Sequence, residues 1–302
     1  LMVSAMTREG AWHCNQKCVH CYAAGQKQAE EAGTKVYDYQ DSCQNLTFQL
    51  SLELPYGEDS VSTRIRRALV EDFIKDAEEP GFEVTDERPL KPFAGNRNDG
   101  QAVVNYYGKA AYDYLLGLAL DDLEERQGFI KENTSISEEE REEWLANIPM
   151  WEYRQQIRKT IDTPRYVVYT SKGYAYYGGA HGGVTGSGAM TFNKATGKRL
   201  EQMVAPSATN LLQHAIRQGL IGYYGETGED LSEEELLERL FIEDGIIPLP
   251  VQTPHPNATG DSLTFTYTQY EIACYADGMP TFTLSVKDIM PCLTEEAKEV
   301  LR

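Results

Sequence analysis

The sequence has few basic residues and no long apolar segment. Its 302 residues include 47 acidic side chains against 28 lysines and arginines, which gives a formal net charge of −19. A chain with this balance repels a phosphate backbone, so we expect no nucleic acid partner. No apolar run approaches the 18 or more residues of a membrane-spanning helix, so we expect no transmembrane segment in this chain.

A secretory signal peptide is also missing from the printed sequence. The first ten residues, LMVSAMTREG, lack the apolar core of such a signal. Because the printed sequence begins with Leu and not Met, the lack of a signal in its first residues does not exclude export. The length is sufficient for one large domain or two ordinary ones, and the 41% of hydrophobic residues is typical of a globular protein.

The common motifs of hydrolases are absent as well. No G-x-S-x-G nucleophile motif occurs, and the sequence has only five histidines. His214 falls in a predicted helix and His255 in a proline-rich segment, so their spacing does not resemble that of metal ligands. The sequence therefore favours a protein that is not an enzyme.

Cysteine is scarce but unevenly placed. Cys14, Cys18 and Cys21 lie within eight residues, in AWHCNQKCVHCYAAGQ, whereas the other three cysteines are scattered. A disulfide framework spreads its cysteines in pairs, so the tight group indicates a metal site. Its C-x3-C-x2-C spacing, followed by Tyr22, resembles the motif of radical SAM enzymes.

The resemblance to radical SAM enzymes implies a [4Fe–4S] cluster held by Cys14, Cys18 and Cys21, with S-adenosylmethionine on the open iron and a cytoplasmic location. Such enzymes need a partial (βα) barrel, and the pattern after the motif does not predict one. Two other interpretations are a zinc site completed by His13 or His20, and a displaced segment that binds no metal. We expect no cofactor; the alternatives are the [4Fe–4S] cluster with S-adenosylmethionine, or zinc.

After residue 34 the sequence alternates between strand and helix patterns. Period-two runs predict strands at 45–54, 165–179, 188–200, 262–272 and 280–286. Helical periodicity predicts helices after Asp59 or Ser60, over about 101–126, at 151–159, and near 207–220 and 231–242. Ser137 with Glu140 and Ser232 with Glu235 form capping boxes, and Thr294 can cap a short terminal helix.

This order of elements predicts an α+β fold with mixed, mostly antiparallel sheets and packed helices, and no TIM-type barrel. We expect three parts: residues 1–34 as a poorly ordered cysteine segment with linker, residues 35–160 as an N-terminal α+β module, and residues 161–302 as a C-terminal module.

Four C-terminal motifs carry a second resemblance: GGAHG at 178–182, FNKATGK at 192–198, YEIACYADG at 270–278 and TEEAKEVL at 294–301. From about residue 36 to residue 302 the chain resembles the cell-envelope domain of unknown function at the C-terminus of the lysozyme-sensing anti-sigma factor RsiV. This resemblance implies an extracytoplasmic location, at the periplasm or cell surface, and a role in binding or sensing. The implied partner is a lysozyme-like protein or cell-wall material.

The glycine-rich segment YYGGAHGGVTGSG is the most unusual part of this region. Its glycines permit backbone conformations closed to other residues and let a partner approach closely, while tyrosines offer amphipathic contact area. We therefore predict a ligand-binding site there. The alternative is a plain turn between strands, in which the histidine pairs with backbone groups. The predicted ligand-binding residues are Tyr176, Tyr177, Gly178, Gly179, His181 and Gly182.

Overall fold

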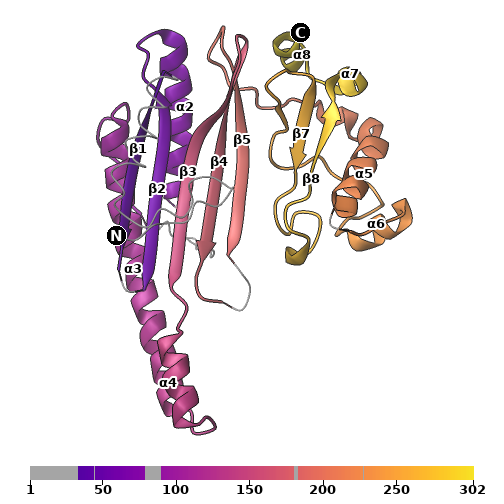
Figure 1. Ribbon diagram of the computed structural model, residues 1–302. Helices are drawn as coiled ribbons and strands as arrows, with labels where there is room; N and C mark the ends of the chain where they lie inside the picture. Colours follow the sequence, from indigo (N-terminus) through magenta and orange to yellow (C-terminus); the bar gives the residue numbers. More distant parts are fainter. Residues whose placement is uncertain (1–32, 44, 79–89, 180–182, 227) are drawn as a thin grey trace, which may run out of the picture.

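The computed structural model describes residues 33–43, 45–78, 90–179, 183–226 and 228–302. A five-stranded sheet with two long helices stands beside a smaller unit built on a three-stranded sheet (Figure 1). The expected α+β class, with mostly antiparallel sheets and no closed barrel, is confirmed. Cys14, Cys18 and Cys21 lie outside the described residues.

The first sheet has the strand order β1-β2-β3-β4-β5. Its strands are β1 (Thr34–Ser42), β2 (Leu46–Pro55), β3 (Trp151–Asp162), β4 (Tyr166–Tyr176) and β5 (Val184–Asn193). Only the β2–β3 pair is parallel, and the sheet is open. The described residues therefore contain no parallel barrel of the kind that a radical SAM enzyme requires.

Two helices cover one face of this sheet: α2 (Ser60–Ala77) and α3 (Gly100–Glu132). Every second residue of β2 points toward them, and these five side chains are at most 1% exposed: Leu46, Phe48, Leu50, Leu52 and Leu54. Asp59 caps α2, as the sequence predicts, by accepting hydrogen bonds from the amides of Val61 and Ser62. The buried apolar stripe of each helix then completes the core.

Helix α3 approaches the sheet closely because a glycine faces it. A Cβ atom at Gly108 would overlap the ring of Tyr39 on β1. The Tyr39 ring in turn meets Phe48 edge-on, with ring centroids 6.1 Å apart. The absence of a side chain at Gly108 thus lets α3 lie against β1 and β2.

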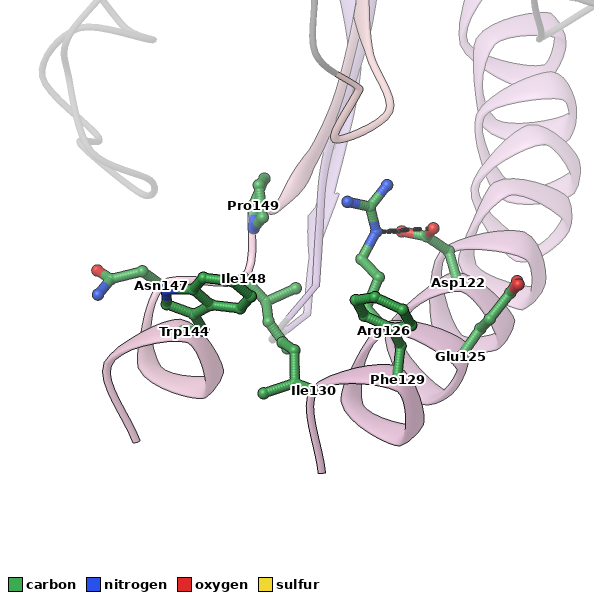
Figure 2. A pocket seen from close by; sticks show the side chains of 9 residues that line it. All are labelled: Asp122, Glu125, Arg126, Phe129, Ile130, Trp144, Asn147, Ile148 and Pro149. Carbon is green, nitrogen blue, oxygen red and sulfur yellow. Dashed lines mark hydrogen bonds and ion pairs between the residues drawn. The ribbon is translucent and has the colours of Figure 1, made fainter. Parts of the chain in front are cut away.

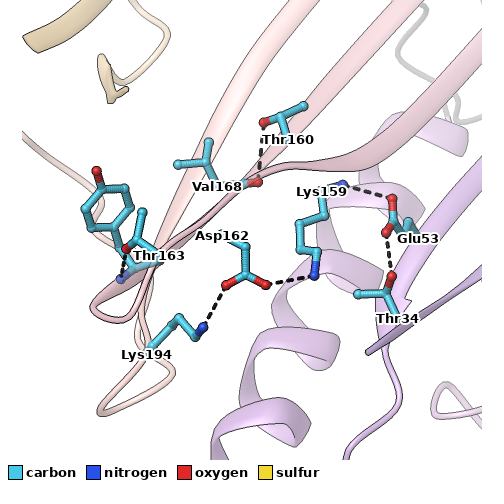
Figure 3. A network of polar contacts seen from close by, with 9 residues as sticks. Thr34, Glu53, Lys159, Thr160, Asp162, Thr163, Val168 and Lys194 are labelled. Atoms are coloured by element: carbon cyan, nitrogen blue, oxygen red, sulfur yellow. Dashed lines mark hydrogen bonds and ion pairs between the residues drawn. The ribbon is translucent and has the colours of Figure 1, made fainter. Parts of the chain in front are cut away.

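The opposite face of β2 carries polar residues, and two of them, Ser51 and Glu53, are buried. Glu53 accepts hydrogen bonds from the Thr34 hydroxyl (2.5 Å) on β1 and from the Lys159 amide (3.0 Å) on β3 (Figure 3). Asp162 pairs with the ammonium groups of Lys159 (2.9 Å) and Lys194 (2.6 Å). This network ties β1, β2, β3 and the turn after β5 together at the β-bulge near Lys159.

The expected helix at 151–159 is wrong, because this segment forms β3. Its residues pair with β2 on one side and β4 on the other. The buried positions Tyr153, Gln155 and Ile157 follow a period of two, but the polar Gln155 hides that alternation in the sequence. Strand β1 was not predicted either, because TKVYDYQDS is an edge strand with mostly polar residues.

The second unit contains a three-stranded sheet of order β6-β7-β8, one long helix and six short α- or 3-10 helices. The long helix is α5 (Thr209–Glu226). The other elements are η1 (Pro206–Ala208), α6 (Glu233–Arg239), β6 (His255–Pro256), β7 (Ser262–Thr266), η2 (Tyr275–Asp277), β8 (Thr281–Ser285), α7 (Val286–Ile289), η3 (Met290–Cys292) and α8 (Glu295–Leu301). The predicted capping residues Ser232 and Thr294 begin α6 and α8.

The two units share a hydrophobic core. Tyr166 and Val168 of β4 and Ala189 of β5 belong to the buried cluster of the second unit. The expected division after residue 160 falls inside β3. This strand pairs with β2, which precedes the division, and with β4, which follows it. Among the described residues, every helix is too short or too polar to span a membrane.

Candidate functional site

A cavity lies where α3 extends past the sheet and meets α4 (Glu138–Ala146) (Figures 1 and 2). We call it the α3–α4 cavity; its volume is about 520 Å³. Side chains of both helices and of the segment after α4 line it: Asp122, Glu125, Arg126, Phe129, Ile130, Trp144, Asn147, Ile148 and Pro149. The site is thus built by a helical arm that the sheet does not cover.

Hydrogen bonds between residues close in the sequence fix the end of α3 and the start of α4, the two helices that line the cavity. The amide of Asn133 closes α3 by donating to the Phe129 carbonyl (3.0 Å). Ser137 and Glu140 then form the predicted capping box that begins α4. The Arg141 guanidinium donates to the Asn133 carbonyl (3.0 Å) and ties the start of α4 to the end of α3. The two helices therefore hold the cavity open between them.

Two large apolar side chains are left exposed at the cavity. Phe129 of α3 is 67% exposed and Trp144 of α4 is 44% exposed, whereas the neighbouring Ile130 is buried. Exposed aromatic residues that share a concave surface are typical of a binding site, since their rings offer broad apolar contact area.

A guanidinium group is held in a fixed orientation in the cavity wall. Arg126 donates from Nε to both carboxylate oxygens of Asp122, at 2.8 Å each, across one turn of α3. Asp122 also accepts a hydrogen bond from the Trp151 indole (3.0 Å) at the start of β3. The Trp151 ring in turn packs on Tyr177, with centroids 4.6 Å apart. The sheet thereby supports the side chain of Arg126 through Asp122.

The turn after β4 completes this arrangement. Gly178 is buried and has φ +72°, a left-handed conformation that favours glycine. A Cβ atom there would lie 3.3 Å from Arg126 Nη2 and 3.6 Å from Pro149 Cβ. Burial, and then the nearby Tyr114, raise the pKa of Tyr177 to about 12, so its hydroxyl stays protonated at neutral pH.

The structure thus places part of the predicted ligand-binding segment next to the α3–α4 cavity. Tyr176 and Tyr177 are half-buried, Gly178 is buried against Arg126, and Gly179 is exposed. His181 and Gly182 lie outside the described residues. Sequence reasoning missed the cavity residues themselves; the only available signals were the i, i+4 spacing of Asp122 and Arg126 and the large apolar residues in otherwise charged helices.

The chemistry of the cavity suits binding. Among the described residues that line it are carboxylates, a guanidinium, an amide and apolar groups, but no Ser, Cys or His side chain. Nor do any three His, Cys, Asp or Glu side chains in the described part of the chain lie close enough to hold a metal ion. His214 on α5 faces Glu233 (3.5 Å) and His255 lies on β6, both outside the cavity lining.

Comparison with known proteins identifies a domain in the second unit. Residues 208–287 match the model of the family described as "Protein of unknown function (DUF3298)", so a DUF3298 domain is present there. This region contains α5, α6 and the three-stranded sheet, and the α3–α4 cavity lies outside it. No curated protein matches the chain.

Two crystal structures of DUF3298 family proteins resemble the whole fold. The one from Bacteroides fragilis has a TM-score of 0.57 and 16% sequence identity, and the match covers 89% of this chain and 96% of that one. The one from Pseudomonas aeruginosa has a TM-score of 0.50 and 13% identity, covering 87% of this chain and 95% of that one. At these identities the likeness concerns the fold alone.

Proposed function

We propose that this chain is a non-enzymatic binding or sensing domain of the bacterial cell envelope that recognises cell-wall material in the α3–α4 cavity. The observation that carries the proposal is an open cavity of about 520 Å³ with exposed aromatic side chains and a supported guanidinium. This volume is within the range of about 300–1,000 Å³ that is typical of small-molecule sites. A soluble cell-wall fragment is a ligand of that size.

The envelope location rests on the resemblance of residues 36–302 to the C-terminal domain of RsiV. The DUF3298 domain at residues 208–287 is compatible with this resemblance but does not specify a location or a ligand. In the proposed arrangement the sheet and the DUF3298 domain form a rigid support, and the helical arm of α3 and α4 presents the ligand site.

A lysozyme-like protein is the alternative ligand. The formal net charge of −19 favours association with a cationic protein, because unlike charges attract over several ångströms at low salt. Protein interfaces are, however, commonly flat and bury about 800 Å² on each partner. The concave, aromatic character of the α3–α4 cavity supports the smaller ligand.

Removing either exposed ring should weaken binding of cell-wall fragments to the full chain. We expect Trp144→Ala and Phe129→Ala each to raise the Kd about tenfold, which is about 1.4 kcal/mol, because each variant removes aromatic contact area from the cavity. Isothermal titration calorimetry with solubilised cell-wall fragments measures this effect. Leu211→Ala is the matched control, since Leu211 is 75% exposed on α5, away from the cavity lining.

Three results would contradict the proposed function: no binding of fragments, an equal loss in Leu211→Ala, or wild-type affinity in both aromatic variants. Saturable, salt-sensitive binding of lysozyme without any binding of fragments would instead support the protein alternative.

A further inference from the structure

The proposed function does not yet assign a role to the two terminal nitrogens of the Arg126 guanidinium in the α3–α4 cavity. Its Nε is used by Asp122, but within the described residues the two terminal nitrogens have no hydrogen-bond partner. The Arg126 side chain is 35% exposed, so solvent or a ligand can reach it. Figure 2 shows these nitrogens on the side of Arg126 toward Pro149, away from the ring of Phe129.

Several neighbours hold this guanidinium in one orientation before any ligand arrives. Asp122 binds its inner edge and is itself held by the Trp151 indole. Gly178 leaves room beside the terminal nitrogens, where a side chain would crowd Nη2. An ordered arginine loses little side-chain entropy when it binds, and its planar fork matches the two oxygens of a carboxylate.

We infer that the α3–α4 cavity binds the free carboxylate end of a short peptide-type ligand, with the carboxylate on the terminal nitrogens of Arg126. This inference rests on the proposed function and specifies its ligand class. The apolar rings of Phe129 and Trp144 then contact the part of the ligand that extends from the carboxylate into the cavity. Capture of a terminal carboxylate by a pre-oriented group is an established mode of peptide recognition.

The charges around the cavity restrict this ligand further. Glu125 also lines the cavity, and α4 carries five glutamates, so a ligand with several negative charges is repelled. Amide N–H groups or an ammonium group of the same ligand can instead donate to Glu125. Asp122 also lines the cavity and offsets part of the Arg126 charge, so direct hydrogen bonds from the terminal nitrogens, and not long-range attraction, hold a single carboxylate.

Two matched probes test the inference on the full wild-type chain: N-acetyl-alanyl-alanine and its C-terminal amide. They differ only in the terminal group. We expect the free acid to bind at least about tenfold more tightly, because charge-assisted hydrogen bonds are lost with the amide. Calorimetry gives both affinities, and the indole N–H signals of Trp144 and Trp151 in NMR spectra report whether the cavity is occupied.

Variants then assign the preference to Arg126. Arg126→Gln should abolish the preference for the acid, and Arg126→Lys should reduce it, because lysine keeps the charge without the planar fork. Arg67→Gln is the control, since Arg67 is 80% exposed on α2. Circular dichroism confirms that each variant is folded.

Equal affinity for the acid and the amide, or no binding of either, would overturn the inference. If cell-wall fragments still bind and depend on Trp144, the proposed function survives that result and only the carboxylate assignment fails. If no fragment binds the wild-type chain, the proposed function itself fails.

Discussion

Replacing Asp277 with Ala should lower the free energy of unfolding of the full chain by about 3 kcal/mol. The Asp277 side chain is 2% exposed and accepts a hydrogen bond from Arg239 Nε at 3.0 Å. Arg239 is stacked over the Tyr224 ring, 4.4 Å from its centroid, and cannot leave this position easily. Breaking a buried pair costs about 3–5 kcal/mol. Because Arg239 is 31% exposed and keeps Glu229 as a second partner, we expect a loss at the lower end of that range. Urea denaturation followed by circular dichroism measures the loss.

An exposed ion pair provides the control for this prediction. Arg67 and Glu71 are 2.9 Å apart on α2, and their side chains are 80% and 51% exposed. Glu71→Ala should change the free energy of unfolding by less than about 0.5 kcal/mol, because exposed pairs contribute little. If Asp277→Ala costs no more than Glu71→Ala, the Arg239–Asp277 pair does not stabilise the second unit as we expect.

The contribution of Asp277 should also depend on pH. Burial raises the pKa of this carboxyl, but hydrogen bonds from Arg239 and from the Cys274 thiol lower it by more, so the pKa lies below its ordinary value. The unfolded chain then binds more protons than the folded chain as the pH falls. The stabilisation is complete above the unfolded pKa of about 3.9 and is lost as the pH falls through the folded value. The difference in stability between wild type and Asp277→Asn should therefore shrink below about pH 4, as urea titrations at several pH values would measure.

Phe48→Ala should destabilise the first sheet by about 4 kcal/mol. Phe48 is 1% exposed, and its ring packs between Tyr39, Tyr112 and Tyr153, with centroids 5.4–6.1 Å away. Truncating a buried phenylalanine removes these contacts and leaves a cavity, which costs about 3–5 kcal/mol. Thermal and urea denaturation of the full chain check the value.

The same substitution at an exposed phenylalanine is the matched control. Phe129→Ala should leave the free energy of unfolding within about 0.5 kcal/mol of wild type, because Phe129 is 67% exposed. A loss of similar size in both variants would show that the Phe48 site is not the densely packed core described above. Phe48→Leu keeps an apolar side chain and should cost less than half as much as Phe48→Ala.

Several elements could be predicted because their causes are local. The caps at Asp59, Ser137, Ser232 and Thr294 need only residues within three or four positions of the helix start. The alternation of leucines and phenylalanine in β2 is likewise contained in ten residues. The absence of a regular βα alternation was sufficient to predict the α+β class.

Other features depend on partners that are far apart in the sequence. Strand β3 carries a helix-like pattern, and only its pairing with β2 and β4 makes it a strand. The polar strand β1 is stabilised by its pairing with β2 and by the close approach of α3 at Gly108. Sheet hydrogen bonds of this kind satisfy backbone groups whatever the local preference of the segment.

The features of the candidate site likewise include some that the sequence predicts and others that depend on tertiary contacts. The sequence by itself determined that the chain is acidic and that it folds as α+β, and it predicted a ligand site in the YYGG segment at the end of β4. Only the tertiary structure decided that this segment lies against Arg126 and that Asp122 is held by Trp151, 29 positions along the chain. Local patterns are encoded by neighbouring residues, whereas a cavity requires distant segments to be brought together by the packing of a shared core.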